Sequence, residues 1–309
     1  MNAIETHGLS RRFGRVEALR SLDLAVPEGT VYALLGPNGA GKTTTIRLLM
    51  NLLDPTAGSA RVLGVDARHL GPREWARIGY VADGMELPDW MTLRAFLDYC
   101  RPLYPAWDRD LEKSLLTRFE LPTAQKLKHF SRGMRIKAAL LAALAYRPTL
   151  LVLDEPFGGL DPLVREDFVR GVLEVSALGD WTVFLSSHDI EEVERLADWV
   201  AVLDHGEQRL AEPLDDLQKR FRRIVVTHSA SAPTVPQPSA DWLEYAHEGA
   251  LVRFVESRYV AGETEARVRE IFPGATITVR PLPLREIYLA LARGTQSSAE
   301  NSASREAIR

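Results

Sequence analysis

The sequence has little of several features that define other classes of protein. It contains one cysteine, Cys100, so no disulfide can form within the chain, which suits a reducing compartment without proving one. With 38 Lys and Arg against 42 Asp and Glu, it has no overall basic field of the kind that recruits nucleic acid. No apolar run reaches the ~18 to 20 residues that span a bilayer, and the first residues lack the pattern of a signal peptide. We therefore expect a chain that does not itself cross a membrane.

What the sequence does contain is enough apolar material for a sizeable core. The hydrophobic share is 46% of 309 residues, which suits one large domain and a smaller one.

A glycine-rich stretch between a predicted strand and a predicted helix is the strongest motif. An apolar run from Thr30 to Leu35 precedes it, and a segment of helical periodicity follows from Thr44 to Met50. The stretch fits the pattern G-x-x-x-x-G-K-[ST] and reads Gly36, Pro37, Asn38, Gly39, Ala40, Gly41, Lys42, Thr43, Thr44. Its backbone N–H groups can surround one anion, Lys42 can reach the β and γ phosphates, and the Thr43 hydroxyl can bind Mg²⁺. The alternative is a tight turn with a surface lysine, but the motif and both flanks together predict a phosphate site.

Two further strand ends carry side chains suited to nucleotide hydrolysis. The apolar run from Leu150 to Leu153 ends at Asp154 and Glu155. The run from Thr182 to Leu185 is followed by His188. Open α/β sheets bind ligands at the carboxyl ends of their strands, where Asp154 can hold a metal, Glu155 can deprotonate a water and His188 can contact a γ phosphate. A plain acidic turn and an ordinary surface histidine are the alternatives, and the phosphate site upstream favours catalysis.

For several aromatic residues, the sequence allows both a structural and a functional role. Phe13 lies before a glycine in a charged hairpin, where it can pack in a core or stack on a purine base. From Asp83 to Lys128 the sequence predicts a helical insertion. The insertion is rich in aromatic residues that form either its small core or a protein-docking face, namely Trp90, Tyr99, Tyr104 and Trp107.

Taken together, these motifs resemble the nucleotide-binding subunit of an ABC transporter. The resemblance covers about residues 2–220 and rests on five motifs in order: Gly36 to Thr44, Ser131 to Met134, Leu150 to Glu155, Gly159 to Asp161, and His188. The stretch from Tyr104 to Asp108 and the form of the signature resemble ATPases of bacterial drug or small-molecule exporters. The implied fold is an α/β P-loop NTPase of ABC type, with a mixed sheet core, an antiparallel β subdomain and a helical insertion at about residues 83–147.

The resemblance also implies roles for individual residues and the cofactors ATP and Mg²⁺. The implied catalytic residues are Lys42, Glu155 as the base and His188 as the switch histidine. The residues implied to contact the nucleotide are Phe13, Gly36 through Thr44, Asp83, Ser131, Gly133 and Asp161. Ser131 and Gly133 contact the γ phosphate held by the opposite protomer, and Asp161 lies in a loop that bridges protomers. The implied metal ligands are Thr43, Asp83 and Asp154.

Two positions depart from the family pattern. The usual signature L-S-G-G-Q reads Phe130-Ser131-Arg132-Gly133-Met134 here, so the serine and the second glycine remain and the final glutamine does not. Ser131 also reads simply as the N-cap of a long apolar helix. Asp83 stands where the family has its lid glutamine, and a carboxylate there is shorter and negative but can still bind Mg²⁺ or water.

The rest of the chain predicts a small α+β appendage at residues 221–293. Its expected strands are Leu243 to Ala246, Leu251 to Glu256 and Thr276 to Arg280, and its expected helices are Glu263 to Ile271 and Leu284 to Ala292. Ser229 to Asp241 reads as a linker or exposed loop, and residues 294–309 as a disordered tail.

By resemblance, the chain hydrolyses ATP to ADP and phosphate and powers transport, in the export direction, through a separate membrane-spanning permease. It is expected on the cytoplasmic face of the membrane, as a homodimer or as a heterodimer with a related ATPase subunit, and without nucleic acid. The alternative is a soluble ABC ATPase that acts on nucleic acid or ribosomes, but the single P-loop and the lack of heptads or a basic stripe favour the transporter. A third hypothesis, a nucleotide-binding regulator without turnover, requires that Glu155 be inert.

Overall fold

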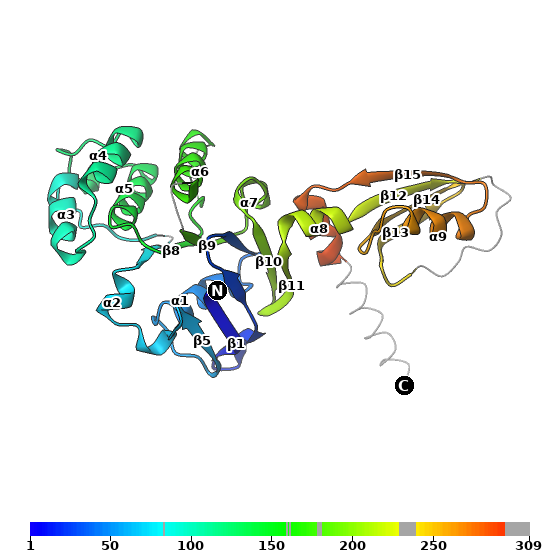
Figure 1. Ribbon diagram of the computed structural model, residues 1–309, viewed down its shortest axis with the longest axis horizontal. Coiled ribbons are helices and arrows are strands. Elements are labelled where there is room, and N and C mark those ends of the chain that lie inside the picture. Colours follow the sequence, from blue (N-terminus) through cyan, green and yellow to red (C-terminus); the bar gives the residue numbers. More distant parts are fainter. Residues whose placement is uncertain (83, 159, 161, 178–180, 229–238, 294–309) are drawn as a thin grey trace. The chain divides into compact units, whose positions relative to one another are not determined.

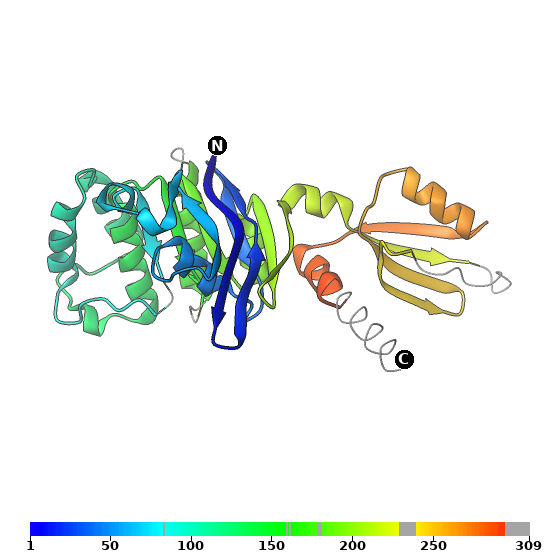
Figure 2. The same cartoon turned by 90° about the horizontal axis from the view of Figure 1, so that it is seen from below.

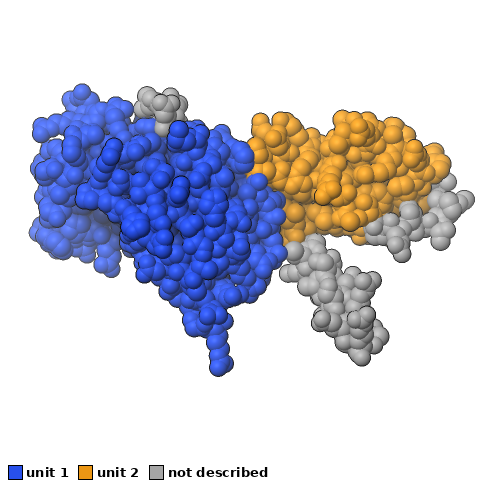
Figure 3. Space-filling model, turned by 60° about the horizontal axis from the view of Figure 1, so that its bottom comes forward, with its two compact units in different colours: residues 1–211 blue, residues 212–309 orange. Residues whose placement is uncertain are grey.

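The computed structural model describes residues 1–309 except 83, 159, 161, 178–180, 229–238 and 294–309. The tail and most of the expected linker therefore lie outside the described residues. The chain forms two compact units, Met1–Ala211 and Glu212–Arg309, which Figure 3 colours separately. In the described residues, the first unit has two sheets and the second has one, and each unit has a buried apolar core of its own.

A six-stranded sheet forms the centre of the first unit (Figure 1). Its order is β11-β10-β4-β9-β8-β7, and the pairs from β10 to β7 are all parallel. The strands are β4 Val31–Leu35, β7 Ile78–Val81, β8 Leu150–Asp154, β9 Thr182–Ser187, β10 Trp199–Asp204 and β11 Glu207–Pro213. Every residue of β4, β8 and β9 is buried, as expected for central parallel strands covered on both faces. Because these strands are parallel, their carboxyl ends meet at one edge of the sheet.

An antiparallel sheet forms a second layer of the first unit, and it is the expected β subdomain. Its order is β2-β1-β5-β6, with β3 also paired to β1. The strands are β1 Asn2–Phe13, β2 Val16–Leu22, β3 Ala25–Pro27, β5 Ala57–Val62 and β6 Val65–Asp66. The local pattern of the sequence indicates a strand only at Ala3 to Thr6. Gly8, with φ of 58°, and irregular register at Leu9 and Arg11 break the alternation that would have revealed the remainder.

Helix α1, Lys42–Leu49, follows the glycine-rich loop and packs into one core with both sheets. That core includes Ile4 and Leu22 of the antiparallel sheet, Ile46 of α1, and Leu34 of β4. The helix is therefore held between the two layers, so its N-terminus has a fixed position at the strand ends.

Helices make up one end of the first unit, where α3, α4 and α5 lie together in both ribbon views (Figures 1 and 2). The α-helices of this unit, besides α1, are α2 Pro72–Trp75, α3 Leu93–Cys100, α4 Arg109–Arg118, α5 Arg132–Leu144, α6 Pro162–Ala177 and α7 Ile190–Leu196. Three short 3₁₀ helices are η1 Ala67–His69, η2 Arg101–Leu103 and η3 Leu127–His129. The expected helical insertion is thus present.

The aromatic residues of the insertion divide between the two roles left open. The Tyr104 ring stacks at 3.8 Å on that of Tyr146, and the Trp107 indole donates a 2.7 Å hydrogen bond to Glu112. These two aromatic residues are half-buried and pack within the helical region. Trp90 is 72% exposed and Tyr99 61% exposed, so a core role is wrong for both.

The second unit is a four-stranded antiparallel sheet with a helix on one face. Its order is β13-β14-β12-β15. The elements are α8 Leu214–Arg220, β12 Arg222–Thr227, β13 Trp242–Glu248, β14 Leu251–Glu256, α9 Glu263–Ile271 and β15 Thr276–Pro281, and residues 284–293 are helical. Val268 of α9 packs against Ile224 and Phe254 of the sheet. With this α+β unit the fold class expected from the sequence is confirmed.

One central strand of this unit, β12, was not predicted. It begins with Arg222 and Arg223, which obscure the apolar alternation at Ile224 and Val226. The strand is central because β14 and β15 both pair with it.

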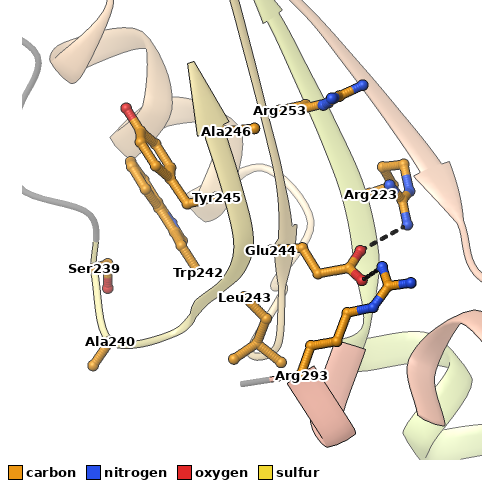
Figure 4. A pocket seen from close by; sticks show the side chains of 10 residues that line it. All are labelled: Arg223, Ser239, Ala240, Trp242, Leu243, Glu244, Tyr245, Ala246, Arg253 and Arg293. Atoms are coloured by element: carbon orange, nitrogen blue, oxygen red, sulfur yellow. Dashed lines mark hydrogen bonds and ion pairs between the residues drawn. The ribbon is translucent and has the colours of Figure 1, made fainter. Parts of the chain in front are cut away.

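A cavity of about 730 Å³ opens in the second unit (Figure 4). On one side Glu244 accepts from Arg223 at 3.3 Å and from Arg293 at 2.8 Å. Trp242 and Tyr245 stack on the other side of β13, with ring centroids 5.9 Å apart. None of the phosphate-site residues lines this cavity, so it is separate from the nucleotide motifs.

Among the described residues, no helix has the length and apolar character needed to cross a membrane.

Candidate nucleotide site

The glycine-rich loop joins β4 to α1 in a conformation that only glycine permits at two positions. Gly41 has φ of 109°, and a Cβ there would lie 2.5 Å from the Ala18 carbonyl oxygen of β2. A Cβ on Gly36 would lie 2.3 Å from the Leu203 carbonyl oxygen of β10. The loop is therefore fixed closely between β2 and β10, with its backbone free of side chains that would obstruct an anion at the N-terminus of α1.

Lys42 is held inside this loop, where it is 4% exposed. Its Nζ donates to the Gly36 carbonyl at 2.7 Å and to the Pro37 carbonyl at 3.1 Å. The same Nζ lies 2.9 Å from Glu155 Oε1. The loop thus positions the ammonium group, and Glu155 compensates its charge.

Asp154, at the end of β8, is joined to the loop through hydroxyl groups. Its Oδ1 accepts from Ser186 Oγ at 2.7 Å and from Thr43 Oγ1 at 3.1 Å. Burial raises the pKa of the Asp154 carboxyl, and the hydrogen bonds from Ser186 and Thr43 oppose that rise. The carboxylate is therefore stabilised by the same two hydroxyl groups that fix its position.

Glu155 adopts an unusual backbone conformation directly after β8. Its φ is 47°, in the left-handed region that costs a non-glycine residue about 1–3 kcal/mol. Its N–H donates to Ser186 Oγ at 3.0 Å, which helps to hold that conformation. Strain of this kind is maintained by the surrounding structure, and here it turns the carboxylate toward the loop.

His188 completes the group from the end of β9. Its Nδ1 lies 2.7 Å from Glu155 Oε2, and its backbone N–H donates to the same oxygen at 3.3 Å. The imidazole is 52% exposed, so it is open to solvent on its other side. Lys42 at the start of α1, Glu155 after β8 and His188 after β9 therefore form one continuous chain of contacts.

Ser186 is the contact residue that sequence reasoning missed. Its hydroxyl donates to Asp154 and accepts from Glu155, so it fixes both acids. The β8–β9 register places Asp154 opposite Ser186. Its signal in the sequence was a polar residue directly after the apolar run that ends at Leu185.

Ser131 forms the N-cap of α5, as predicted. Its Oγ accepts from the Met134 N–H at 3.2 Å, and Gly133 is buried one residue inside the helix. Among the described residues, no hydrogen bond joins Ser131 or Gly133 to the glycine-rich loop of the same chain.

Phe13 lies at the tip of the β1–β2 hairpin and is 46% exposed. The core-packing alternative is therefore wrong at this residue, and base stacking stays a prediction. The second strand of the hairpin reaches the loop, because Ala18 contacts Gly41. Asp83, Gly159 and Asp161 lie outside the described residues.

The residues present suit a Mg²⁺ ion that takes few of its ligands from protein side chains and the rest from water and phosphate. The Thr43 hydroxyl and the Asp154 carboxylate are 3.1 Å apart and are oxygen donors of the hard kind that Mg²⁺ prefers. In the described part of the chain, no group of three or more His, Cys, Asp or Glu side chains is arranged to hold a metal. Mg²⁺ in nucleotide sites typically takes its remaining ligands from water and phosphate, so this small donor set fits it.

A buried strand, a glycine-rich loop with its lysine at a helix start, and two acids at the next strand end define a P-loop nucleotide hydrolase. Comparison with known proteins identifies the family. The family model described as "ABC transporter" matches residues 19–158, and one described as "AAA domain, putative AbiEii toxin, Type IV TA system" matches residues 123–194.

Two bacterial relatives match most of the chain. The daunorubicin resistance ATP-binding protein DrrA2 of Streptomyces coeruleorubidus is 32% identical over 298 residues, which are 94% of this chain and 87% of that protein. The bacitracin transport ATP-binding protein BcrA of Enterococcus faecalis is 27% identical over 265 residues, which are 84% and 86% of the two chains. A solved structure titled "Structure of ATP binding subunit of ABC transporter" matches with a TM-score of 0.64 and 29% identity, over 70% of this chain and 92% of that one.

The chain belongs to the ATP-binding proteins of ABC transporters. It is the subunit that binds and hydrolyses ATP to power transport. Nothing in these relatives supports the alternative of an ATPase that acts on nucleic acid or ribosomes.

Proposed function

We propose that the contact chain of Lys42, Glu155 and His188 is the catalytic centre for ATP hydrolysis. The observation that carries this proposal is the position of Glu155, whose two carboxylate oxygens lie 2.9 Å from Lys42 Nζ and 2.7 Å from His188 Nδ1. A carboxylate held on both sides in this way has one orientation. It is therefore preorganised to act on a water at a fixed place.

When bound, Mg-ATP supplies the phosphoanhydride bond that water cleaves. Backbone N–H groups of the glycine-rich loop and of the start of α1, together with the Nζ of Lys42, bind the phosphates. Glu155 orients the attacking water and accepts its proton at a carboxylate oxygen. His188 holds that carboxylate and contacts the γ phosphate with the side of the ring that faces solvent.

We assign Mg²⁺ to the Thr43 hydroxyl and the Asp154 carboxylate, with Asp83 as a further ligand. The hydrogen bonds that Asp154 accepts from Thr43 and Ser186 support its ionised form, which is the form that binds a cation. The Thr43 oxygen would then be available to the metal as a ligand, and the hydrogen bond from Ser186 would keep the Asp154 carboxylate in place.

Two protomers complete each other's sites in this proposal. Ser131 is exposed at the N-terminus of α5, where its Oγ caps its own helix by accepting from the Met134 N–H, so we infer that this helix end can meet a phosphate of another molecule. Ser131 and Gly133 of one protomer contact the ATP of its partner, with Asp161 in the connecting loop. The simplest assembly is a homodimer, and a heterodimer with a related ATPase subunit has the same geometry.

The transport partner is a separate membrane-spanning permease, which places this chain on the cytoplasmic face of the membrane. The helical insertion carries features suited to docking it, because Trp90 and Tyr99 are exposed. A groove of about 320 Å³ between the end of β7 and α5 lies on the same unit and is lined by Met85, Ile136 and others. The names of the relatives, daunorubicin resistance and bacitracin transport, support export of a small molecule or drug.

The domain assignment proposed from the sequence takes residues 2–220 as the ATPase, 221–293 as an appendage without catalytic residues and 294–309 as a tail. The two compact units divide between Ala211 and Glu212, so α8 belongs to the second unit.

The test is purification of the chain from detergent extracts of its own cells with whatever membrane protein accompanies it. The expected companion has about six apolar segments of ~20 residues each. ATP hydrolysis by the complex should fall when Glu155 is replaced by Gln. A companion without apolar segments would contradict the permease, and an unchanged hydrolysis rate would contradict the catalytic centre.

A further inference from the structure

The hairpin tip that carries Phe13 holds a second side chain against the ring. The guanidinium carbon of Arg11 lies 4.6 Å from the centroid of the Phe13 ring. Arg11 is partly buried, whereas Phe13 keeps 46% of its surface exposed. Arg11 therefore covers one face of the ring, and the opposite face is the one open to a stacking partner.

Arg11 is itself anchored to the turn that follows the P-loop helix. Its Nη1 donates to the Asp54 carbonyl at 2.7 Å. Two further hydrogen bonds join β1 to the same turn. The Arg12 N–H donates to Thr56 Oγ1 at 3.0 Å, and the Thr56 N–H donates to the Ser10 carbonyl at 2.8 Å. Arg11 thus connects the ring of Phe13 to the turn that follows α1. The N-terminus of the same helix is the proposed phosphate site.

We propose that Arg11 is a positioning residue for nucleotide binding, which holds the Phe13 ring in place as the stacking surface for the base. This inference rests on the proposed role of Phe13. A cation against one face of an aromatic ring is attracted by the ring quadrupole and limits rotation of the side chain. The anchor at Asp54 then sets the distance between the base platform and the phosphate site. Arg11 acts on the base half of the nucleotide and leaves the phosphate half alone.

The experiment compares ATP with inorganic tripolyphosphate, which has the phosphates and lacks the base. Isothermal titration with Mg²⁺ present measures both dissociation constants in the full-length protein. Arg11→Ala should weaken ATP binding about two- to five-fold, the range expected for an exposed cation–π contact. It should leave tripolyphosphate binding unchanged, and that binding also shows that the P-loop of the variant is folded. Arg11→Lys, which keeps the charge over the ring, should restore part of the ATP affinity.

Arg12→Ala is the matched control, since it removes the same charge from the next position on β1. If Arg11 contributed only positive charge to the phosphates, both variants would weaken ATP and tripolyphosphate alike, and the inference would be wrong. In a Phe13→Ala background, Arg11→Ala should have no further effect on ATP binding. An additional loss there would also overturn the positioning role.

The same measurements separate this inference from the proposed function. Phe13→Ala should weaken ATP binding about five- to 150-fold, the range for loss of a base–aromatic stack, and spare tripolyphosphate. If Phe13→Ala is selective for ATP and Arg11→Ala is not, only the role of Arg11 is wrong. If Phe13→Ala shows no selectivity, the stacking role of Phe13 is wrong and the role of Arg11 falls with it.

Discussion

Replacement of Glu155 by Gln is the perturbation that examines the site most directly. The amide keeps the size of the side chain and can still contact His188 and Lys42, but it cannot accept a proton from water. Loss of a positioned general base commonly costs about 10²- to 10⁴-fold in rate. We expect steady-state ATP hydrolysis of the Glu155→Gln variant to fall within that range.

ATP binding should survive the same change for a reason visible in the structure. Lys42 loses the charge of Glu155 at 2.9 Å but keeps its hydrogen bonds to the Gly36 and Pro37 carbonyls. Its ammonium is then compensated by fewer negative groups, which favours the arrival of phosphate. The dissociation constant for ATP should therefore be unchanged or lower in the variant.

The assay pairs phosphate release at saturating Mg-ATP with a titration of a fluorescent ATP analogue. Glu248→Gln is a suitable control because it makes the same acid-to-amide change at a side chain that is 66% exposed in the second unit. That control should hydrolyse ATP at the wild-type rate. A Glu155→Gln variant with a wild-type rate would refute the assignment of the base, and one that lost ATP binding would refute the account of Lys42.

The other predictions concern Ser186, Ser131 and Glu244. Ser186→Ala removes a hydrogen bond that lowers the pKa of Asp154, so that pKa should rise further. The acid limb of the ATPase pH profile should then move to higher pH. Thr182→Ser, measured beside it, is the control for a change in β9. Glu155→Gln should dimerise with Mg-ATP in light scattering, and the added change Ser131→Glu should keep it monomeric by placing a negative charge at the phosphate contact; a dimer that persists would contradict the two-fold arrangement. Glu244→Ala should lower the free energy of unfolding by about 1 kcal/mol, seen as a lower thermal midpoint, without changing ATP affinity, since Glu244 pairs partly exposed arginines of the second unit.

The sequence was informative where function depends on a local motif. A strand, a glycine-rich loop and a helix are contiguous, so the positions from Gly36 to Thr44 could be read directly. The acids after β8 and the histidine after β9 were also readable, because each follows a buried apolar run. Their meeting at one edge follows from parallel pairing, which the alternation of strands and helices predicts.

Long-range pairing and backbone strain were not readable. Ser186 fixes the acids only because β8 and β9 pair in the register that sets Asp154 opposite it, and no local pattern encodes that register. The positive φ of Glu155 depends on contacts made after folding. Exposure of Trp90 was hidden for a similar reason, since composition does not say which aromatic residues of an insertion meet each other.

The arrangement of the acids explains how one residue can be strained and still well placed. Glu155 leaves β8 with a left-handed φ that ordinary side chains avoid, and the cost is of the same order as a few hydrogen bonds. Ser186 receives its N–H, and His188 and Lys42 hold its two oxygens. Ser186 lies in β9 and Lys42 begins α1, so the buried core fixes both, and His188 directly follows β9. These fixed partners oppose relaxation of the strain. A carboxylate held in this way pays little reorganisation when a water arrives, which is what a general base requires.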